Sequence, residues 1–186
     1  TASICIPPCY IERIQETYGG TINICTVIGF PLGYETTATK VAAAKQAVKH
    51  GASEVDMVIN IADVKNGEYD KVTNEITALK KAVGKKILKV IVEACYLTEE
   101  EKIAMCNAVT KAGADFIKTS TGFGSGGATH ADVQLFRKHI GPNVKIKAAG
   151  GIHTIEDMKL FIAEGCSRLG ASSAVKLLKD KAEAEV

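Results

Sequence analysis

The sequence predicts an α/β fold in which a parallel β-sheet is covered by helices. Short runs rich in Ile, Val, Leu and Thr alternate along the chain with longer segments of helical periodicity. The strand runs are almost continuously apolar, which is typical of parallel sheets with both faces covered. This pattern is compatible with an open doubly wound sheet or with a closed barrel, and an internal repeat favours the barrel.

Seven strands are expected from the apolar runs. Each run is dominated by aliphatic or β-branched residues, which fit a pleated and buried surface. In chain order the expected strands are Ala2–Ile6, Ile22–Phe30, Glu54–Asn60, Ile87–Glu93, Phe116–Thr121, Lys145–Gly150 and Arg168–Ala171.

The segments between the strands predict amphipathic helices that cover the sheet. Their apolar residues recur at spacings of three and four, which places them on one helix face. The spacing is clearest at Val72, Ile76, Leu79 and Val83, and again at Met158, Phe161 and Ile162.

Local signals mark where these helices begin and end. Thr98 with Glu101, and Thr154 with Asp157, have the spacing of a capping box at a helix N-terminus. Glycine is the residue that most often follows the last turn of a helix. Four glycines stand where helices should end: Gly51, Gly84, Gly113 and Gly165.

The internal repeat consists of a helix-ending glycine, a small residue and then a strand. It begins at Gly51, Gly113 and Gly165. If the units are equivalent, residues five positions after each glycine lie at similar heights on three strands, as in the repeated βα units of a barrel. These residues are Asp56, Lys118 and Gly170.

Length and composition predict one folded domain over residues 1–186. The chain is 46% hydrophobic and 24% charged, which is enough apolar surface for a core and argues against disorder. A formal net charge of +2 without clustered lysines makes nucleic acid a poor partner and a small molecule a better one. No apolar run approaches the ~20 residues that span a bilayer, and no secretory leader is recognisable, so a cytoplasmic protein without a membrane partner is expected.

The cysteine pattern predicts mostly buried, reduced thiols. The chain has no repeated Cys-x-x-Cys pair and is large enough to fold without disulfides. The six cysteines are Cys5, Cys9, Cys25, Cys95, Cys106 and Cys166.

Ionisable residues interrupt four of the apolar strands: Asp56, Lys89, Lys118 and Lys147. A lone charge inside a covered parallel sheet costs several kcal/mol, so a shared polar cluster is the economical arrangement. The alternative is that each lysine extends along its apolar stem to solvent at a strand end.

Such a cluster has the chemistry of a covalent amine catalyst. Two partly desolvated lysines disfavour each other's protonation, so one of them can lose its proton. The nucleophile that forms a Schiff base must be such a neutral amine. An aspartate bonded to the partner lysine keeps its charge and can shuttle protons through a water.

Glycine-rich segments follow two of the last strands. Gly150-Gly151 precedes the helix capped at Thr154, and Gly170-Ala171-Ser172-Ser173 precedes another helix. In (β/α)₈ barrels the loops after strands seven and eight commonly bind phosphate through backbone N–H groups at helix N-termini. Each segment alone could be only a turn, and Ser125-Gly126-Gly127 could be a flexible loop.

Four motifs together resemble the deoxyribose-phosphate aldolase family: 115-DFIKTSTG-122, 54-EVD-56, 147-KAAGGI-152 and 170-GASS-173. The resemblance extends over essentially the whole chain. It implies a TIM (β/α)₈ barrel and a class I aldolase that needs neither metal nor cofactor. The implied reaction is the reversible cleavage of 2-deoxy-D-ribose 5-phosphate to D-glyceraldehyde 3-phosphate and acetaldehyde.

The resemblance also implies roles for individual residues. Lys118 matches the lysine that forms the imine, Lys147 the second lysine that perturbs it, and Asp56 the carboxylate that moves protons through a water. Lys89 and Cys5 match positions that line the site. The residues that match the surroundings of the substrate phosphate are Gly122, Gly150, Gly151, Ser172 and Ser173.

One feature of the family is absent. The family begins with a further strand and helix, whose strand carries an Asp-His-Thr motif, whereas this sequence opens at what resembles the second strand. The resemblance therefore predicts a barrel without its first βα unit, either in a shortened chain or in an incomplete barrel. Alternatives to the aldolase are a non-catalytic sugar-phosphate binder and a structural fragment whose exposed sheet edges drive homo-oligomerisation.

Overall fold

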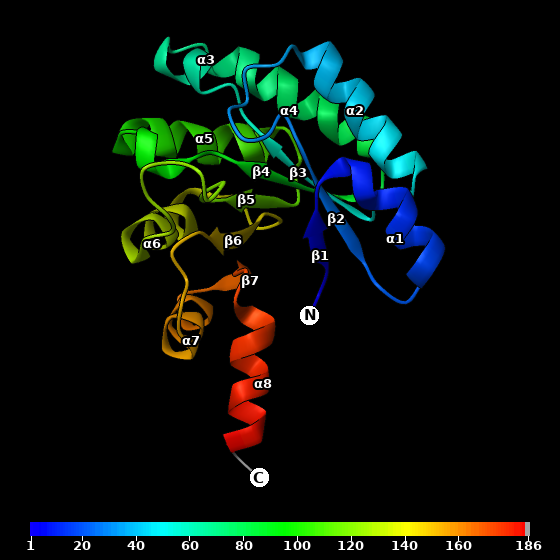
Figure 1. Ribbon diagram of the computed structural model, residues 1–186. Coiled ribbons are helices and arrows are strands. Elements are labelled where there is room, and N and C mark those ends of the chain that lie inside the picture. Colours follow the sequence, from blue (N-terminus) through cyan, green and yellow to red (C-terminus); the bar gives the residue numbers. More distant parts are fainter. Residues whose placement is uncertain (185–186) are drawn as a thin grey trace.

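A computed structural model describes residues 1–184 of the chain; the last two residues of the expected domain lie outside this range. Its centre is one curled sheet of seven parallel strands in the order of the sequence (Figure 1). The strands are β1 (Ile4–Ile6), β2 (Ile24–Ile28), β3 (Glu54–Val58), β4 (Ile87–Ile91), β5 (Phe116–Lys118), β6 (Lys145–Ala149) and β7 (Cys166–Gly170). The predicted parallel α/β fold and all seven predicted strands are confirmed.

The expected strand limits need small corrections. Most strands are shorter than their apolar runs; β2 ends at Ile28, for example, because Gly29 adopts a left-handed conformation with φ of 65°. β7 instead begins at Cys166, two residues before the expected start, because Cys166 pairs with Ile146 of β6. Within the described residues β1 and β7 form the two edges of the sheet.

Helices cover the outer side of the curl (Figure 1). The helix ends agree with the sequence signals: capping boxes begin at Thr98 and Thr154, and a glycine follows each of four helices. The α-helices are α1 (Ile11–Tyr18), α2 (Thr37–Lys49), α3 (Ile61–Lys65), α4 (Tyr69–Val83), α5 (Glu99–Lys111), α6 (His130–His139), α7 (Ile155–Ala163) and α8 (Ala174–Ala184), with short 3₁₀ turns η1 (Pro8–Tyr10) and η2 (Ala94–Tyr96).

The hydrophobic core lies between the outer face of the sheet and these helices. Val55 and Met57 of β3 are fully buried in it together with Ile76 and Leu79 of α4. Because side chains alternate across a strand, Asp56 between them points to the inner face of the curl. The covered outer face therefore holds the fold together and leaves the inner face for polar residues.

A buried ion pair lies under the loop after β2. Lys40 of α2 is completely buried, and its Nζ donates to Glu75 Oε2 of α4 at 2.8 Å and to the Val58 carbonyl at 2.9 Å. A Cβ on Gly29 would stand only 2.8 Å from Lys40 Cε, so the loop packs directly on the lysine stem. The sequence analysis did not single out this pair, because nothing local distinguishes Lys40 from the exposed helical lysines.

Replacing Lys40 with Met is expected to destabilise the fold by about 3 kcal/mol, because the carboxylate of Glu75 would remain buried without its partner. Urea unfolding measures the loss. The double variant Lys40→Met with Glu75→Leu should regain most of it, since no unpaired charge is left. A single variant as stable as the parent chain would contradict a structural role for the pair.

The cysteine prediction is correct for only half of the set. Cys25, Cys106 and Cys166 are buried, but Cys5 and Cys9 are exposed. Cys5 lies on edge strand β1 and Cys9 on the η1 turn, and neither belongs to the hydrophobic core. The sixth, Cys95, is partly buried, and all six are free thiols.

No helix in residues 1–184 is long and apolar enough to cross a membrane.

Candidate active site

Three lysines from three strands meet one buried carboxylate. Asp56 of β3 is completely buried, and its Oδ1 accepts a hydrogen bond from Lys89 Nζ of β4 at 2.8 Å. Its Oδ2 accepts from Lys118 Nζ of β5 at 2.9 Å and from Lys147 Nζ of β6 at 2.7 Å. The expected shared polar cluster is therefore present, and the alternative in which the lysines extend separately to solvent is wrong.

The strand register explains why these residues meet. Asp56 pairs with Lys89 across β3 and β4, and Lys118 pairs with Lys147 across β5 and β6. Curling of the sheet then brings the two pairs face to face. Side-chain exposure is 9% or less for all four residues, so water screens their charges poorly.

The charges of the cluster shift the pKa values of its members. Burial would raise the pKa of Asp56, but the ammonium groups of Lys118, Lys147 and Lys89 outweigh it and hold this pKa well below its usual range. Burial likewise opposes the charged form of Lys89, and the opposite charge of Asp56 raises its pKa nonetheless. Asp56 is thus ionised at neutral pH in the resting site.

A second acidic residue, at the N-terminal end of β3, extends the cluster. Glu54 Oε2 lies 2.6 Å from Lys89 Nζ, and its Oε1 accepts from Arg168 of β7 at 3.0 Å. Ser3 also donates to Glu54, at 2.9 Å. Sequence reasoning missed Glu54 and Arg168 as members of the site, although Glu54 stands two residues before Asp56 and so faces the same side of the strand.

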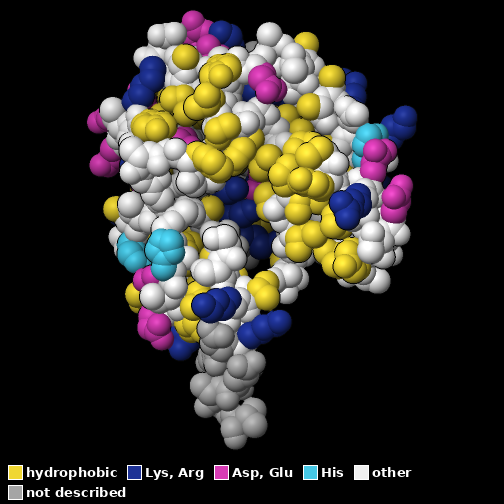
Figure 2. Space-filling model, in the orientation of Figure 1, with side chains coloured by type: hydrophobic (Ala, Val, Ile, Leu, Met, Phe, Trp, Pro, Cys, Tyr) yellow, Lys and Arg dark blue, Asp and Glu magenta, His cyan; other side chains and the backbone are white. Residues whose placement is uncertain are grey.

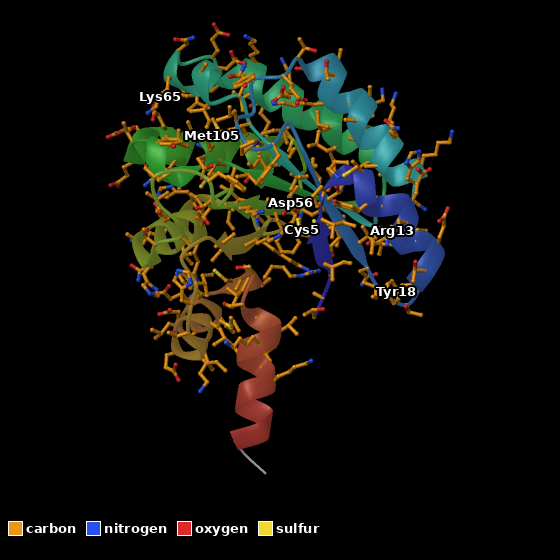
Figure 3. The ribbon with its side chains drawn as sticks, in the orientation of Figure 1. Cys5, Arg13, Tyr18, Asp56, Lys65 and Met105 are labelled. Atoms are coloured by element: carbon orange, nitrogen blue, oxygen red, sulfur yellow. The ribbon has the colours of Figure 1, made fainter. Side chains whose placement is uncertain are left out.

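Cys5 of β1 and Cys25 of β2 form the remaining wall of the cluster. Cys25 Sγ donates to Asp56 Oδ1 at 3.1 Å and accepts from Lys89 Nζ at 3.4 Å. Figure 3 shows Cys5 and Asp56 beside one another at the centre of the curled sheet. Cys5 thus lies where the sequence placed it, and Cys25 is an additional neighbour.

Two of the three glycine-rich segments contact each other beside this cluster. A Cβ on Gly150 would lie 3.2 Å from Gly127 Cα and 3.6 Å from Gly122 Cα, and the Ala128 N–H donates to the Gly150 carbonyl at 3.1 Å. Gly122, Gly150 and Gly151 have φ between 74° and 90°, a conformation that favours glycine. A Cβ on Gly127 would stand only 2.4 Å from the Gly150 carbonyl oxygen, so this close approach leaves no room for a side chain at Gly127.

The third segment follows the neighbouring strand. Gly170 of β7 pairs with Ala149 of β6, so Ser172 and Ser173 follow β7 next to the loop that contains Gly150. Ser172 is exposed, and the Ser173 carbonyl accepts from Leu177 in the first turn of α8. The repeat position Gly170 lies close to the cluster, since a Cβ there would stand 3.4 Å from Lys147 Cε.

Comparison with known proteins identifies the family of this chain. Residues 1–180 match the model of the DeoC/LacD family aldolases. The chain is 73% identical over 179 residues to the deoxyribose-phosphate aldolase of Clostridium botulinum (strain Alaska E43 / Type E3), covering 96% of this chain and 81% of that protein. It is 60% identical to the deoxyribose-phosphate aldolase of Clostridioides difficile (strain 630), covering 97% of this chain and 82% of that protein.

The chain belongs to the DeoC/LacD aldolase family.

Solved structures agree with this assignment. An aldolase described as QR15 superimposes with a TM-score of 0.93 at 36% identity, over 99% of this chain and 83% of that chain. The deoxyribose phosphate aldolase of Aeropyrum pernix superimposes with a TM-score of 0.85 at 29% identity, over 95% of this chain and 76% of that chain. The barrel-type fold and the aldolase activity are thus shown, and the non-catalytic alternatives are not favoured.

Glu93 of this aldolase was missed by sequence reasoning. It follows β4 in a left-handed conformation with φ of 49°, and it is only 2% exposed. Its carboxylate accepts from the backbone N–H of Thr121 at 3.1 Å and from the Thr121 hydroxyl, which in turn accepts from the Phe123 N–H at 3.0 Å. Glu93 therefore fixes the aldolase loop that follows Lys118, and its non-glycine left-handed backbone was not recognisable from the sequence.

The aldolase cluster does not suit a metal ion. Within the described residues Cys5, Cys25 and Asp56 form a group whose ligand atoms all lie within 4.8 Å of one another. Both oxygens of Asp56, however, already accept from lysine ammonium groups. A cation placed there would lie against these ammonium groups, so the donor set favours amine chemistry over metal binding.

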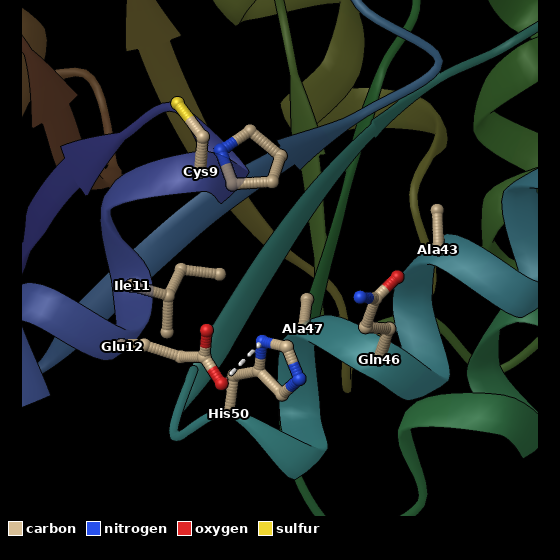
Figure 4. Close-up of a pocket in the computed structure, with 8 residues that line it drawn as sticks. Cys9, Ile11, Glu12, Ala43, Gln46, Ala47 and His50 are labelled. Atoms are coloured by element: carbon tan, nitrogen blue, oxygen red, sulfur yellow. Dashed lines mark ion pairs between the residues drawn. The ribbon is translucent and has the colours of Figure 1, made fainter.

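The cluster of the aldolase opens to solvent on one face. Figure 2 shows basic side chains with an acidic one at the bottom of a hollow in the middle of this face. A separate pocket of about 230 Å³ lies between α1 and α2, with the Glu12–His50 ion pair of 3.4 Å at its wall (Figure 4). None of the residues that the sequence analysis assigned to the site lines this pocket, so we place the aldolase chemistry at the lysine cluster.

Proposed function

We propose that the chain cleaves 2-deoxy-D-ribose 5-phosphate reversibly to D-glyceraldehyde 3-phosphate and acetaldehyde. The observation that carries this proposal is the buried carboxylate with three lysines in a chain 73% identical to a deoxyribose-phosphate aldolase. The iminium nitrogen of a lysine Schiff base serves as the electron sink for carbon–carbon cleavage. The proposed reaction therefore requires neither a metal nor an organic cofactor.

Lys118 is the proposed nucleophile. Its Nζ attacks the substrate carbonyl carbon, and the resulting carbinolamine loses water to form the imine. Cleavage of the carbon–carbon bond then releases the phosphorylated aldehyde and leaves an enamine, which takes a proton and is hydrolysed to acetaldehyde. Exposure argues against Lys89, whose side chain has none, but it does not separate Lys118 at 7% from Lys147 at 9%. The match of Lys118 to the imine-forming lysine of the family decides between these two.

Lys147 is the proposed second lysine that perturbs Lys118, and Asp56 is the proposed proton-handling residue. Lys147 donates to the same oxygen of Asp56 as Lys118 does, so the two amines share one hydrogen-bond acceptor. Asp56 holds both amines in place and can exchange protons with the substrate through a water. Lys89 and Cys5 are the other proposed residues of the site. Lys89 is fully buried and bonds Asp56 and Glu54.

The glycine-rich loops are the proposed phosphate site. Gly122 and Gly150 lie next to each other, Gly151 follows, and Ser172 and Ser173 precede the N-terminus of α8 on the adjacent strand. Backbone N–H groups of glycine-rich loops can bind an anion, and a helix N-terminus adds a favourable dipole. No charged side chain is needed for such a site.

The overall proposal is tested by incubating the purified chain with 2-deoxy-D-ribose 5-phosphate and measuring acetaldehyde and D-glyceraldehyde 3-phosphate with coupled dehydrogenases. Both products should appear in equal amounts. Binding of the substrate without formation of either product would contradict the proposal and support a binding protein instead.

Replacing Lys147 with Leu is expected to slow imine formation and to move its pH profile upward. Two amines that share one carboxylate oxygen repel each other when both are protonated, so removing one eases protonation of the other. Stopped-flow measurement of imine formation with acetaldehyde between neutral and alkaline pH checks this. An unchanged pH profile would show that the two lysines are not coupled.

Replacing Ser172 with Asp is expected to lower kcat/KM selectively for the phosphorylated substrate. The new carboxylate would stand against the phosphate, and because Ser172 is exposed the change should not disturb the fold. Comparing kcat/KM for 2-deoxy-D-ribose 5-phosphate and for 2-deoxy-D-ribose isolates the effect. We expect a loss of about tenfold or more for the phosphate ester only, which corresponds to ~1.4 kcal/mol. Equal losses for both sugars would place the phosphate elsewhere.

Self-association is also part of the proposal. The Aeropyrum pernix relative is described as a tetramer, and this chain exposes Leu160 and Ile162 on α7 and Val175 and Leu178 on α8. Apolar side chains grouped at one end of a molecule are typical of an interface. Light scattering after size-exclusion chromatography distinguishes a homo-oligomer from a monomer.

A further inference from the structure

Two cysteines lie side by side at the edge of the lysine cluster. β1 and β2 are parallel neighbours, and Cys5 is the register partner of Cys25. Both sulfur atoms lie within 4.8 Å of each other and of an Asp56 carboxylate oxygen, so the two side chains share the inner face of the sheet.

The spacing of the two residues fits a disulfide. Neighbouring strands are about 4.8 Å apart, and Cα atoms joined by a disulfide are about 4.4–6.8 Å apart. A bond between Cys5 and Cys25 therefore requires rotation of the side chains but no separation of the strands.

The two thiols differ in a way that separates their roles. Cys5 is exposed, and its pKa is lowered to about 7, first by the hydrogen bond with Cys25 and also by the charges of Lys147 and Lys118, against the effects of burial and Asp56. Cys25 is fully buried, and the bond with Cys5, burial and the charge of Asp56 raise its pKa. An accessible thiolate next to a buried thiol is the arrangement of a reactive cysteine and its resolving partner.

We propose that Cys5 and Cys25 are a peroxide-reactive pair that closes to a disulfide inside the active site. The Cys5 thiolate attacks one oxygen of hydrogen peroxide, the O–O bond breaks, and the leaving hydroxide takes a proton to become water. Cys25 gives up its proton and its sulfur displaces the hydroxyl group of the Cys5 sulfenic acid as a second water. Two thiols and one peroxide thus yield one disulfide and two waters.

The disulfide has a direct consequence for the cluster. Cys25 would lose the S–H group that donates to Asp56 Oδ1 at 3.1 Å, and the sulfur atoms would be drawn together beside the carboxylate. The pairing itself does not depend on the proposed function; only the expected loss of aldolase turnover rests on it.

Peptide mass spectrometry of the full chain tests the pairing. The reduced protein is treated with a small excess of hydrogen peroxide, alkylated with iodoacetamide and digested with trypsin without reduction. Cys5 lies in the tryptic peptide of residues 1–13 and Cys25 in that of residues 14–40. We expect these two peptides joined, with fragment ions that place the bond at Cys5, and their separation after dithiothreitol.

Two variants make the result specific. Cys9 shares the first peptide but lies on η1, so Cys9→Ser should keep the cross-link. Cys25→Ala should abolish it and leave Cys5 as a sulfenic acid that dimedone labels. Loss of the cross-link in Cys9→Ser would overturn the proposal. So would oxidation of Cys5 to the sulfinic acid while Cys25 in the parent chain remains fully alkylated.

Activity provides a second readout. Peroxide should lower turnover of the parent chain several-fold, and dithiothreitol should restore it. In Cys25→Ala the loss should no longer be restored by dithiothreitol once Cys5 has passed to the sulfinic acid. If mass spectra show the disulfide in a chain without aldolase activity, the pairing of Cys5 with Cys25 is supported and only the proposed function is rejected.

Discussion

Replacing Lys118 with Leu is expected to lower the rate of deoxyribose 5-phosphate cleavage by about 10⁴-fold or more, because the variant lacks the amine that forms the imine. The measurement is the steady-state rate with product detection. Leu conserves the apolar stem of the side chain, which lies in the buried strand β5, so the fold should persist. Circular dichroism and urea unfolding verify that the variant is folded.

Covalent trapping locates the nucleophile directly. Reduction with borohydride in the presence of acetaldehyde should add one ethyl group, and peptide mass spectrometry should find it on Lys118. Lys145 offers a matched control, since it lies on β6 two residues before Lys147 but is exposed. Lys145→Leu should keep the adduct and the activity. An adduct on Lys147 or Lys89 of the parent chain would refute the assignment of Lys118.

Replacing Asp56 with Asn is expected to affect activity and stability together. The amide retains the shape of the carboxylate but leaves Lys89, Lys118 and Lys147 without their shared counter-charge. Breaking a buried ion pair by removing one partner costs about 3 kcal/mol or more. Turnover should fall by about 10²-fold or more, because the proton path through the carboxylate is lost.

The effect on stability depends on pH in a defined direction. The pKa of Asp56 is lower in the folded than in the unfolded chain, so its contribution to stability is present above the unfolded value of about 4. That contribution is lost as the pH falls from there toward the lower folded pKa. The stability difference between the parent chain and Asp56→Asn should therefore be largest near neutral pH and shrink below about pH 4.

A surface carboxylate serves as the control for this experiment. Asp70 of α4 pairs at 3.5 Å with Lys111, and both side chains are exposed. Asp70→Asn should cost about 1 kcal/mol or less, as exposed pairs contribute little. If Asp56→Asn were no more destabilising than Asp70→Asn at neutral pH, the charge of Asp56 would not be holding the lysine cluster together.

The sequence by itself determined the order and type of the elements. Alternating apolar runs and helical spacings are local signals, and they located all seven strands, while Thr98 and Thr154 marked two helix starts. The mid-strand charges Asp56, Lys118 and Lys147 were also visible, since a charge in a covered strand requires a partner. The repeat at Gly51, Gly113 and Gly165 favoured the barrel, and resemblance supplied the substrate class.

Only the tertiary structure decided which groups meet. Glu54 and Arg168 are separated by 114 positions in the sequence, and their contact depends on the register of the strands and on the curl of the sheet. The same holds for Lys118 and Lys147 on one oxygen of Asp56, for Cys5 beside Cys25, and for the buried pair of Lys40 with Glu75. Spacing along a strand specifies the face on which a side chain lies, whereas the distance between side chains on different strands is set by packing of the whole sheet against its helices.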